Sequence, residues 1–139
     1  MTMSEAPFRW PIRVYWEDTD AGGVVYHASY LRFLERARSE YLRHLGIEQE
    51  RLRNDNNLVF VVRDIAIGFI KPARLDDVLD VTVALAERRP ASLVFQQQIL
   101  HASDGRLLSE ARVRAACVDA AGFRPRPIPD DLFVESAKA

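Results

Sequence analysis

The chain has 139 residues, of which 48% are hydrophobic and 28% are charged. This length and composition are typical of one globular domain that can bury a core without disulfides, and they argue against disordered and fibrous classes. The 19 lysines and arginines nearly balance the 20 acidic residues, so no overall positive field attracts nucleic acid. We therefore interpret residues 1–139 as a single globular domain that does not bind nucleic acid.

The sequence also bears on the cellular compartment. Cys117 is the one cysteine, so it cannot form an internal disulfide, which fits a reducing environment. No apolar run approaches the roughly 18 residues of a membrane span, and residues 1–9 lack the basic-then-apolar layout of a secretion signal. We expect a cytoplasmic protein without a membrane span.

The first predicted element is a strand. Ile12, Val14 and Trp16 alternate with polar or charged neighbours, a period of two that indicates a half-buried strand after Pro11. The turn-forming residues 18–23 then end it.

A long amphipathic helix is predicted from about His27. The apolar residues on its inner face are Tyr30, Phe33, Leu34, Ala37, Tyr41 and Leu45. Gly46 supplies the flexible residue that commonly ends a helix, with Ile47 after it as the usual apolar contact. A helix of about 18 residues is roughly 27 Å long, enough to cross a small domain.

The remainder is predicted to consist mostly of strands. A short helical turn over residues 48–53, broken by the asparagine-rich residues 54–57, precedes them. The expected strands cover residues 58–70, 79–85, 93–99 and 107–118, with a hairpin turn at Asp104-Gly105 and a proline-rich tail after residue 124. Small residues in the last strand, among them Cys117, would let a helix approach closely. Because a lone helix and an antiparallel sheet each have one apolar face to bury, we predict an α+β fold with a curved antiparallel sheet of about five strands wrapped around one helix.

The junction between the first strand and the helix carries the candidate chemistry. Asp20 is short and lies in a turn, where it could activate water or attack a carbonyl. The first turn of the helix offers free N–H groups at His27 and Ala28, which could hold a developing oxyanion. Gly22 and Gly23 would permit close approach by a ligand.

Three other interpretations of this segment are a turn-forming role, a calcium loop and a phosphatase nucleophile. Asp18 or Asp20 could simply form a turn by bonding to nearby backbone, and the residue types alone favour that interpretation. An EF-hand calcium loop is rejected because Ser29 stands where a bidentate glutamate belongs and no helix precedes the loop. A phosphatase nucleophile is disfavoured because the chain lacks alternating strands and helices.

A family resemblance covers nearly the whole chain. The segments that carry it are Phe8-Arg9-Trp10-Pro11, residues 15–30, Glu35-Arg36-Ala37-Arg38, residues 60–63, 72–77 and 92–95, and Cys117-Val118-Asp119. Together they resemble the Tol-Pal-associated acyl-CoA thioesterases, in the 4-hydroxybenzoyl-CoA thioesterase branch of the hotdog superfamily. The resemblance implies a sheet wrapped around a helix, a homodimer or homotetramer, and active sites between subunits.

The resemblance also implies an activity. A thioester hydrolase for short-chain or aromatic acyl-CoA is expected, without a cofactor, with Asp20 as catalytic carboxylate and the His27 amide polarising the thioester carbonyl. The His27 side chain would assist, Ala28 would share the oxyanion site, and Gly22, Gly23 and Tyr26 would contact substrate. The alternative is a non-catalytic module on the same fold that binds acyl groups or acyl carrier protein in phospholipid synthesis.

Other candidate residues follow from their surroundings. Arg88 and Arg89, before the Pro90 turn, form a compact basic pair for the CoA phosphates, although ordinary turn charges are an equal alternative. Lys71, Arg74 and Ser92 are lesser candidates.

Several reactive residue types receive structural interpretations. We interpret Cys117 as a core residue and Glu35 as part of a solvated ion pair with Arg32 and Arg38. His44 suits the end of the helix, and His101 offers no partner pattern. We expect no metal site, because the three histidines have no spaced second ligand.

Overall fold

The computed structural model describes residues 7–133 and contains one antiparallel sheet, a long helix and a short one. The elements in chain order are β1 Phe8–Arg13, a 3₁₀ turn Trp16–Asp18, α1 His27–His44, α2 Gln49–Asn56, β2 Leu58–Phe69, β3 Val78–Arg89, β4 Ser92–His101 and β5 Leu107–Asp119. The strand order across the sheet is β1-β3-β4-β5-β2, so β1 and β2 form the two edges. The α+β prediction is confirmed.

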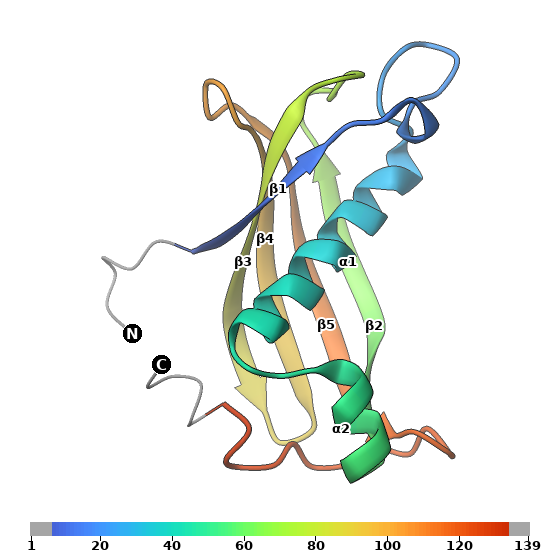
Figure 1. Cartoon of the computed structure of the whole chain (residues 1–139), viewed down its shortest axis with the longest axis vertical. Helices are drawn as coiled ribbons and strands as arrows, with labels where there is room; N and C mark the ends of the chain where they lie inside the picture. The colour runs from blue at the N-terminus through green and yellow to red at the C-terminus, as the bar shows by residue number, and fades with distance from the viewer. Residues whose placement is uncertain (1–6, 134–139) are drawn as a thin grey trace.

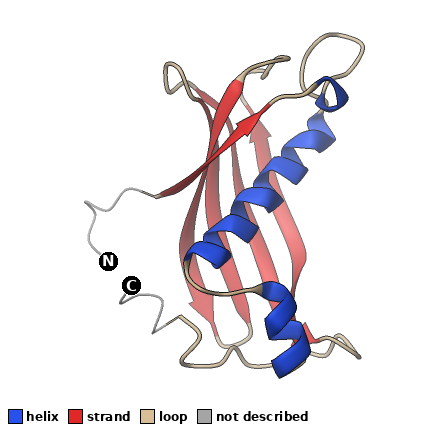
Figure 2. Ribbon diagram, viewed as in Figure 1, coloured by secondary structure: helices blue, strands red, loops and turns tan. Residues whose placement is uncertain are grey.

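Helix α1 crosses one face of the sheet (Figure 1), and it does so because of its apolar stripe. Phe33, Leu34 and Ala37 are fully buried, and Tyr30 is nearly so. The helix lies closest to β1 and β3. Figure 2 shows α1 in front of the sheet and α2 near its lower edge.

The end of α1 is fixed by the glycine that the sequence indicated. Gly46 has φ +85°, and its N–H donates to Arg43 O at 2.9 Å. The Ile47 N–H donates to Leu42 O at 2.8 Å, and Ile47 is buried. These two bonds are those of a Schellman motif, which satisfies carbonyls that the last helical turn leaves free.

The last two strands carry the predicted small inner face. The β4–β5 hairpin turns at Gly105, whose N–H donates to His101 O at 2.8 Å. Ala111, Ala115 and Cys117 of β5 are buried as predicted. Burial raises the pKa of the Cys117 thiol, which keeps the thiol protonated, so the core interpretation is supported over a nucleophile.

Two boundary predictions are wrong. The first strand begins at Phe8 and ends at Arg13, and Trp16 lies in the 3₁₀ turn with 79% of its surface exposed rather than on the inner face. The second helix runs on to Asn56, and the break comes at Asn57, whose φ of 57° ends the helix. Within residues 7–133, no helix is both long and apolar enough to cross a membrane.

Candidate active site

A small hairpin, residues 18–26, connects the 3₁₀ turn to α1. The Asp20 N–H donates to Val24 O at 2.9 Å, and the Tyr26 N–H donates to Asp18 O at 2.8 Å. Gly23, with φ +81°, allows the tight reversal at the tip. Asp20 therefore lies opposite Val24, only three residues before the start of α1, so the hairpin brings the carboxylate and the helix terminus to the same end of the molecule.

Asp18 is a structural carboxylate, as the sequence suggested. It is 3% exposed, and its Oδ2 accepts the Tyr15 N–H at 2.8 Å. Its Oδ1 lies 3.3 Å from a guanidinium nitrogen of Arg32, and that same nitrogen donates to Ser29 Oγ at 3.0 Å. Asp18 thus fastens the base of the hairpin to α1.

Asp20, two residues on, is exposed at the hairpin tip. Its Oδ1 accepts the Gly22 N–H at 2.8 Å, the bond expected of a turn-forming aspartate. A Cβ at Gly22 would lie 3.2 Å from the same oxygen, so Gly22 both bonds the carboxylate and leaves room for it. Among the described residues, Oδ2 accepts no hydrogen bond. The turn role and a reactive role are therefore compatible in one side chain.

The hollow beside Asp20 has a volume of about 480 Å³. It is lined by Trp16, Thr19, Asp20, Ala21, Gly23 and Leu75. The exposed Trp16 ring thus borders the same space as the carboxylate, a placement that the sequence did not indicate.

The start of α1 presents unused backbone donors. The N–H groups of His27 and Ala28 donate to no acceptor within the described part of the chain. The His27 ring lies against Tyr26, with ring centres 4.5 Å apart, and 6.4 Å from Phe69. A pocket of about 250 Å³ adjoins it, lined by Val25, His27, Tyr30, Phe69, Ile70, Lys71 and Pro72. Asp20 and His27 therefore line two separate hollows at the same end of the chain.

Tyr30 holds the β2–β3 loop against this site, a role that the sequence did not reveal. Its hydroxyl accepts the Ala73 N–H at 3.0 Å, and the Ala73 carbonyl accepts the Val25 N–H at 2.8 Å. Burial raises the pKa of Tyr30, so the hydroxyl stays neutral. Only its place on the apolar stripe was visible in the sequence, because Ala73 is 43 residues away.

The candidate residues for the CoA phosphates lie at opposite ends of the sheet. Arg88, Arg89 and Ser92 flank the β3–β4 turn, whereas the hairpin follows the end where Arg13 pairs with Val78 (Figure 1). At about 3.3 Å per residue, β3 separates these ends by over 30 Å. One chain does not bring Arg88, Arg89 and Ser92 to its own Asp20.

These distant arginines also have partners of their own. Arg88 donates to Pro129 O at 3.0 Å and lies over the Phe133 ring, and Arg89 pairs with Glu87 at 3.0 Å.

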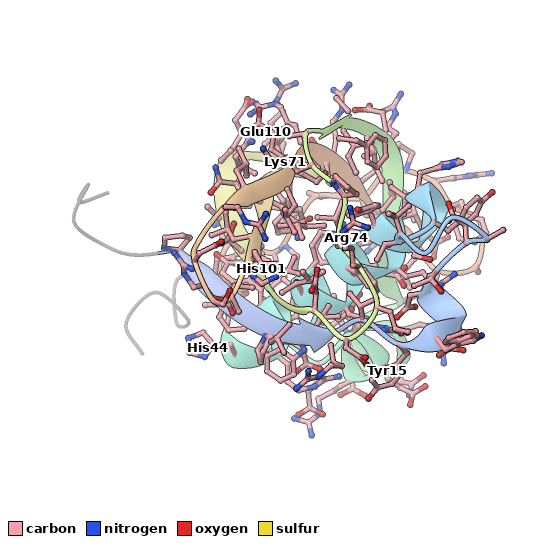
Figure 3. All side chains as sticks on the ribbon, turned by 90° about the horizontal axis from the view of Figure 1, so that it is seen from above. Tyr15, His44, Lys71, Arg74, His101 and Glu110 are labelled. Atoms are coloured by element: carbon pink, nitrogen blue, oxygen red, sulfur yellow. The ribbon has the colours of Figure 1, made fainter. Side chains whose placement is uncertain are left out.

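Of the candidate cations for the CoA phosphates, Lys71 and Arg74 lie toward the hairpin, on the loop between β2 and β3 (Figure 3). Lys71 lines the His27 pocket, and Arg74 pairs through its backbone with Val24 of the hairpin. Two of the residues ranked lower from sequence thus lie closer to Asp20 in this chain.

Two structural interpretations from the sequence are wrong. Arg38 is buried and donates to Gln97, and Arg32 pairs with Asp18, so Glu35 forms no ion pair within 4.0 Å in the described range. His101 has partners after all, since its Nε2 lies 3.4 Å from Asp77 Oδ1. Its Nδ1 lies 2.8 Å from Ser103 Oγ.

His44 lies in the last turn of α1, as expected, with its ring 5.2 Å from that of Phe8. Residues 7–133 contain no group of three histidine, cysteine or acidic side chains that could hold a metal ion.

Comparisons with known proteins agree with this geometry. Residues 14–134 match the family model of the thioesterase-like superfamily. The acyl-CoA thioester hydrolase YbgC of Escherichia coli O157:H7 is 48% identical over 133 residues, which cover 96% of this chain and 98% of the relative. The acyl-CoA thioesterase YbgC of Haemophilus influenzae is 45% identical, with 94% of each chain covered. The crystal structure of a probable thioesterase from Bartonella henselae, 38% identical, superposes with a TM-score of 0.84 and covers 89% of this chain and all of its own.

An antiparallel sheet packed on one long helix, with a carboxylate-bearing hairpin at the helix start, defines a thioester hydrolase of the hotdog type. The chain belongs to the thioesterase-like superfamily. The predicted family, fold and class of enzyme are therefore confirmed.

The Tyr30 hydroxyl should stabilise the loop that borders the site. In Tyr30→Phe the Ala73 N–H loses its acceptor in a buried position, so we expect the free energy of unfolding to fall by about 1–3 kcal/mol. Denaturant unfolding measures it. Tyr41→Phe is the matched control, because Tyr41 is partly buried on the same helix and its hydroxyl bonds to no described residue. Equal losses in the two variants would contradict the assignment.

Proposed function

We propose that the protein hydrolyses acyl-CoA thioesters at the start of α1, with Asp20 as the reacting carboxylate. The observation that carries the proposal is the pair of unused His27 and Ala28 N–H groups at the positive end of the helix, at the same end of the molecule as the exposed Asp20 carboxylate on the hairpin that leads into the helix. The names of the relatives from Escherichia coli and Haemophilus influenzae support acyl-CoA as the substrate.

The chemistry requires a polarised carbonyl and an attacking oxygen. The His27 N–H, with Ala28 next to it, would bind the thioester oxygen as it becomes negative. Asp20 would take a proton from water while the water oxygen attacks the carbonyl carbon. The carbon–sulfur bond then breaks, and the thiolate leaves and is protonated, which gives the free acid and CoA.

A second route uses the same groups. Asp20 would attack the carbonyl carbon itself, expel the thiolate and form an anhydride that water then hydrolyses. The free Oδ2 suits either route, and both remain open.

The acyl group we propose is short or aromatic. The pocket beside His27 is small, at about 250 Å³, and Tyr30, Phe69 and Pro72 give it apolar walls. The exposed Tyr26 ring and the Asp20 hollow, which Gly23 helps to line, would hold the adjoining part of the substrate.

A homodimer would complete this site. β2 is a 12-residue edge strand whose outer backbone is unpaired within the described chain, and such an edge is a template for pairing with another copy. Phe69 and Ile70, at its end, are about half exposed and wall the His27 pocket. A second copy along β2 would therefore enclose that pocket and could supply Arg88, Arg89 and Ser92 to the CoA phosphates, alongside Lys71 and Arg74.

Further expectations from the resemblance stay predictions: a homotetramer, acyl carrier protein as a partner, a link to Tol-Pal, and the absence of a cofactor. The cytoplasm is the proposed location, which the buried, unpaired Cys117 supports. The alternative of a non-catalytic binding module is tested by the same assays as the enzyme.

Asp20 should be essential for turnover. Asp20→Asn keeps the side-chain size but cannot serve as a base or nucleophile, so kcat for acyl-CoA hydrolysis should fall by about 10²- to 10⁴-fold. Release of free thiol from a panel of acyl-CoAs measures the rate. Asp55→Asn, at an exposed position on α2, is the matched control and should keep full activity. Wild-type protein that turns over no acyl-CoA would favour the binding module, and an active Asp20→Asn would remove Asp20 from the mechanism.

His27 should act mainly through its backbone. His27→Ala removes the imidazole but retains the N–H at the start of α1, so we expect kcat to fall by less than about tenfold. Steady-state kinetics across pH measure the effect. A loss as large as that of Asp20→Asn, together with a lost limb of the pH profile, would instead assign proton transfer to the imidazole.

The β2 edge should mediate self-association. Ala66→Asp places a further negative charge beside Asp64 on this edge, and pairing of two copies would bring like charges together. We expect the dimer to weaken, as measured by sedimentation equilibrium. Ala86→Asp, at an exposed position on the interior strand β3, should leave association unchanged. A monomeric wild type would contradict the proposed dimer.

A further inference from the structure

The middle of α1 holds an arginine in an unusual environment. Arg38 is 8% exposed, although its neighbours on the same helix, Glu35 and Arg36, are exposed. Burial lowers the pKa of Arg38, which expresses the cost of keeping the charged form there, and the Glu35 charge offsets only part of that cost. A buried cation normally has a counterion or a full set of acceptors.

A chain of buried hydrogen bonds orients the Arg38 guanidinium. One of its terminal nitrogens donates to Gln97 Oε1 at 3.0 Å. Gln97 is fully buried, and its amide nitrogen donates to Leu34 O at 3.1 Å and to Thr82 O at 3.4 Å. Because both carbonyls require the amide nitrogen, the Gln97 oxygen is fixed toward Arg38.

The rest of the guanidinium is unused by the protein. Arginine has five N–H donors, and within residues 7–133 the single bond to Gln97 is the one that Arg38 makes. No carboxylate of this part of the chain lies within 4.0 Å of it. Every fully enclosed side-chain polar atom described has a partner, so the unused donors face accessible space.

That space is a pocket of about 100 Å³ between α1, α2 and the sheet. Its lining residues are Glu35, Arg38, Ser39, Leu42, Gln49, Phe60, Val62, Phe95 and Ala115. Phe60, Phe95 and Leu42 give it apolar walls, and its size suits a small carboxylic acid. A planar anion with a small apolar body matches this lining, because a guanidinium bonds a carboxylate through two parallel N–H groups.

We propose that this pocket binds a carboxylate, attached to a small apolar or aromatic group, on Arg38. The carboxylate would come from a free carboxylic acid, because Arg38 lies 11 residues along α1 from His27, roughly 16 Å, a distance that a short acyl chain held at His27 does not span. This proposal therefore does not rest on the proposed thioester hydrolysis.

The binding test uses wild-type protein and the probe benzoate, with benzamide as its uncharged analogue. Calorimetry should show that benzoate binds more tightly than benzamide by roughly 10- to 100-fold, the range for hydrogen bonds to charged groups. Equal binding of the two, or no binding of benzoate, would overturn the proposal without recourse to any variant.

The variant Arg38→Met removes the charge and keeps an unbranched side chain. In Arg38→Met the benzoate affinity should fall to that of benzamide. The matched control Arg36→Met, at an exposed position two residues earlier on α1, should bind benzoate as the wild type does. Because Arg38→Met also leaves the buried Gln97 Oε1 without its donor, its thermal midpoint should fall relative to the control, and both variants are titrated at a temperature where each is fully folded. If Arg38→Met keeps wild-type benzoate affinity, the site lies elsewhere and the proposal fails.

An alternative to an external carboxylate is that Glu35 itself is the counterion of Arg38. A rotation of its side chain could pair it with Arg38 three residues on. In that case Glu35→Gln and Arg38→Met would show coupled losses of stability in a double-mutant cycle, and benzoate would not bind. That combination would overturn the carboxylate site.

Discussion

The burial of one face of α1 against the sheet determines where everything else can lie. The apolar stripe from Tyr30 to Ala37 must face the strands, which fixes the rotation of the helix about its axis. Its N-terminus then points to the end of the sheet where the β2–β3 loop emerges. The Tyr30 hydroxyl takes the Ala73 N–H at that point, so the same residue that fills the core also anchors the loop beside the site.

Two aspartates in the hairpin illustrate how environment separates roles. Asp18 is buried, and its two carboxylate oxygens contact the Tyr15 N–H and Arg32. Asp20 is exposed, and Gly22 occupies only one of its oxygens. A buried, paired carboxylate stabilises structure, whereas an exposed oxygen without a hydrogen-bond partner is available for chemistry.

The sequence predicts those features that depend on local periodicity. The period of 3.6 in α1 and the glycine at its end identify the helix, and alternation identifies the strands. The alternation misleads at Trp16, because the chain enters a 3₁₀ turn there and the indole emerges into solvent. The prediction that Arg38 is solvated is wrong for another reason. The helical pattern places it beside charged neighbours, but its guanidinium is buried and bonds to Gln97, 59 residues away in the sequence.

Candidate site residues divide in the same way. Asp20 and His27 are joined by a short hairpin, so their proximity follows from the motif, whereas nothing in the sequence tells that Arg88 lies at the far end of β3. The His27 pocket and the Arg38 pocket share one location, the space between α1 and the edge strand β2. The helix lies closest to β1 and β3, and two pockets lie on its side toward β2. The His27 pocket borders Phe69 at one end of β2, and the Arg38 pocket borders Phe60 near the other. A partner along β2 would close both pockets at once, because one strand supplies a wall to each.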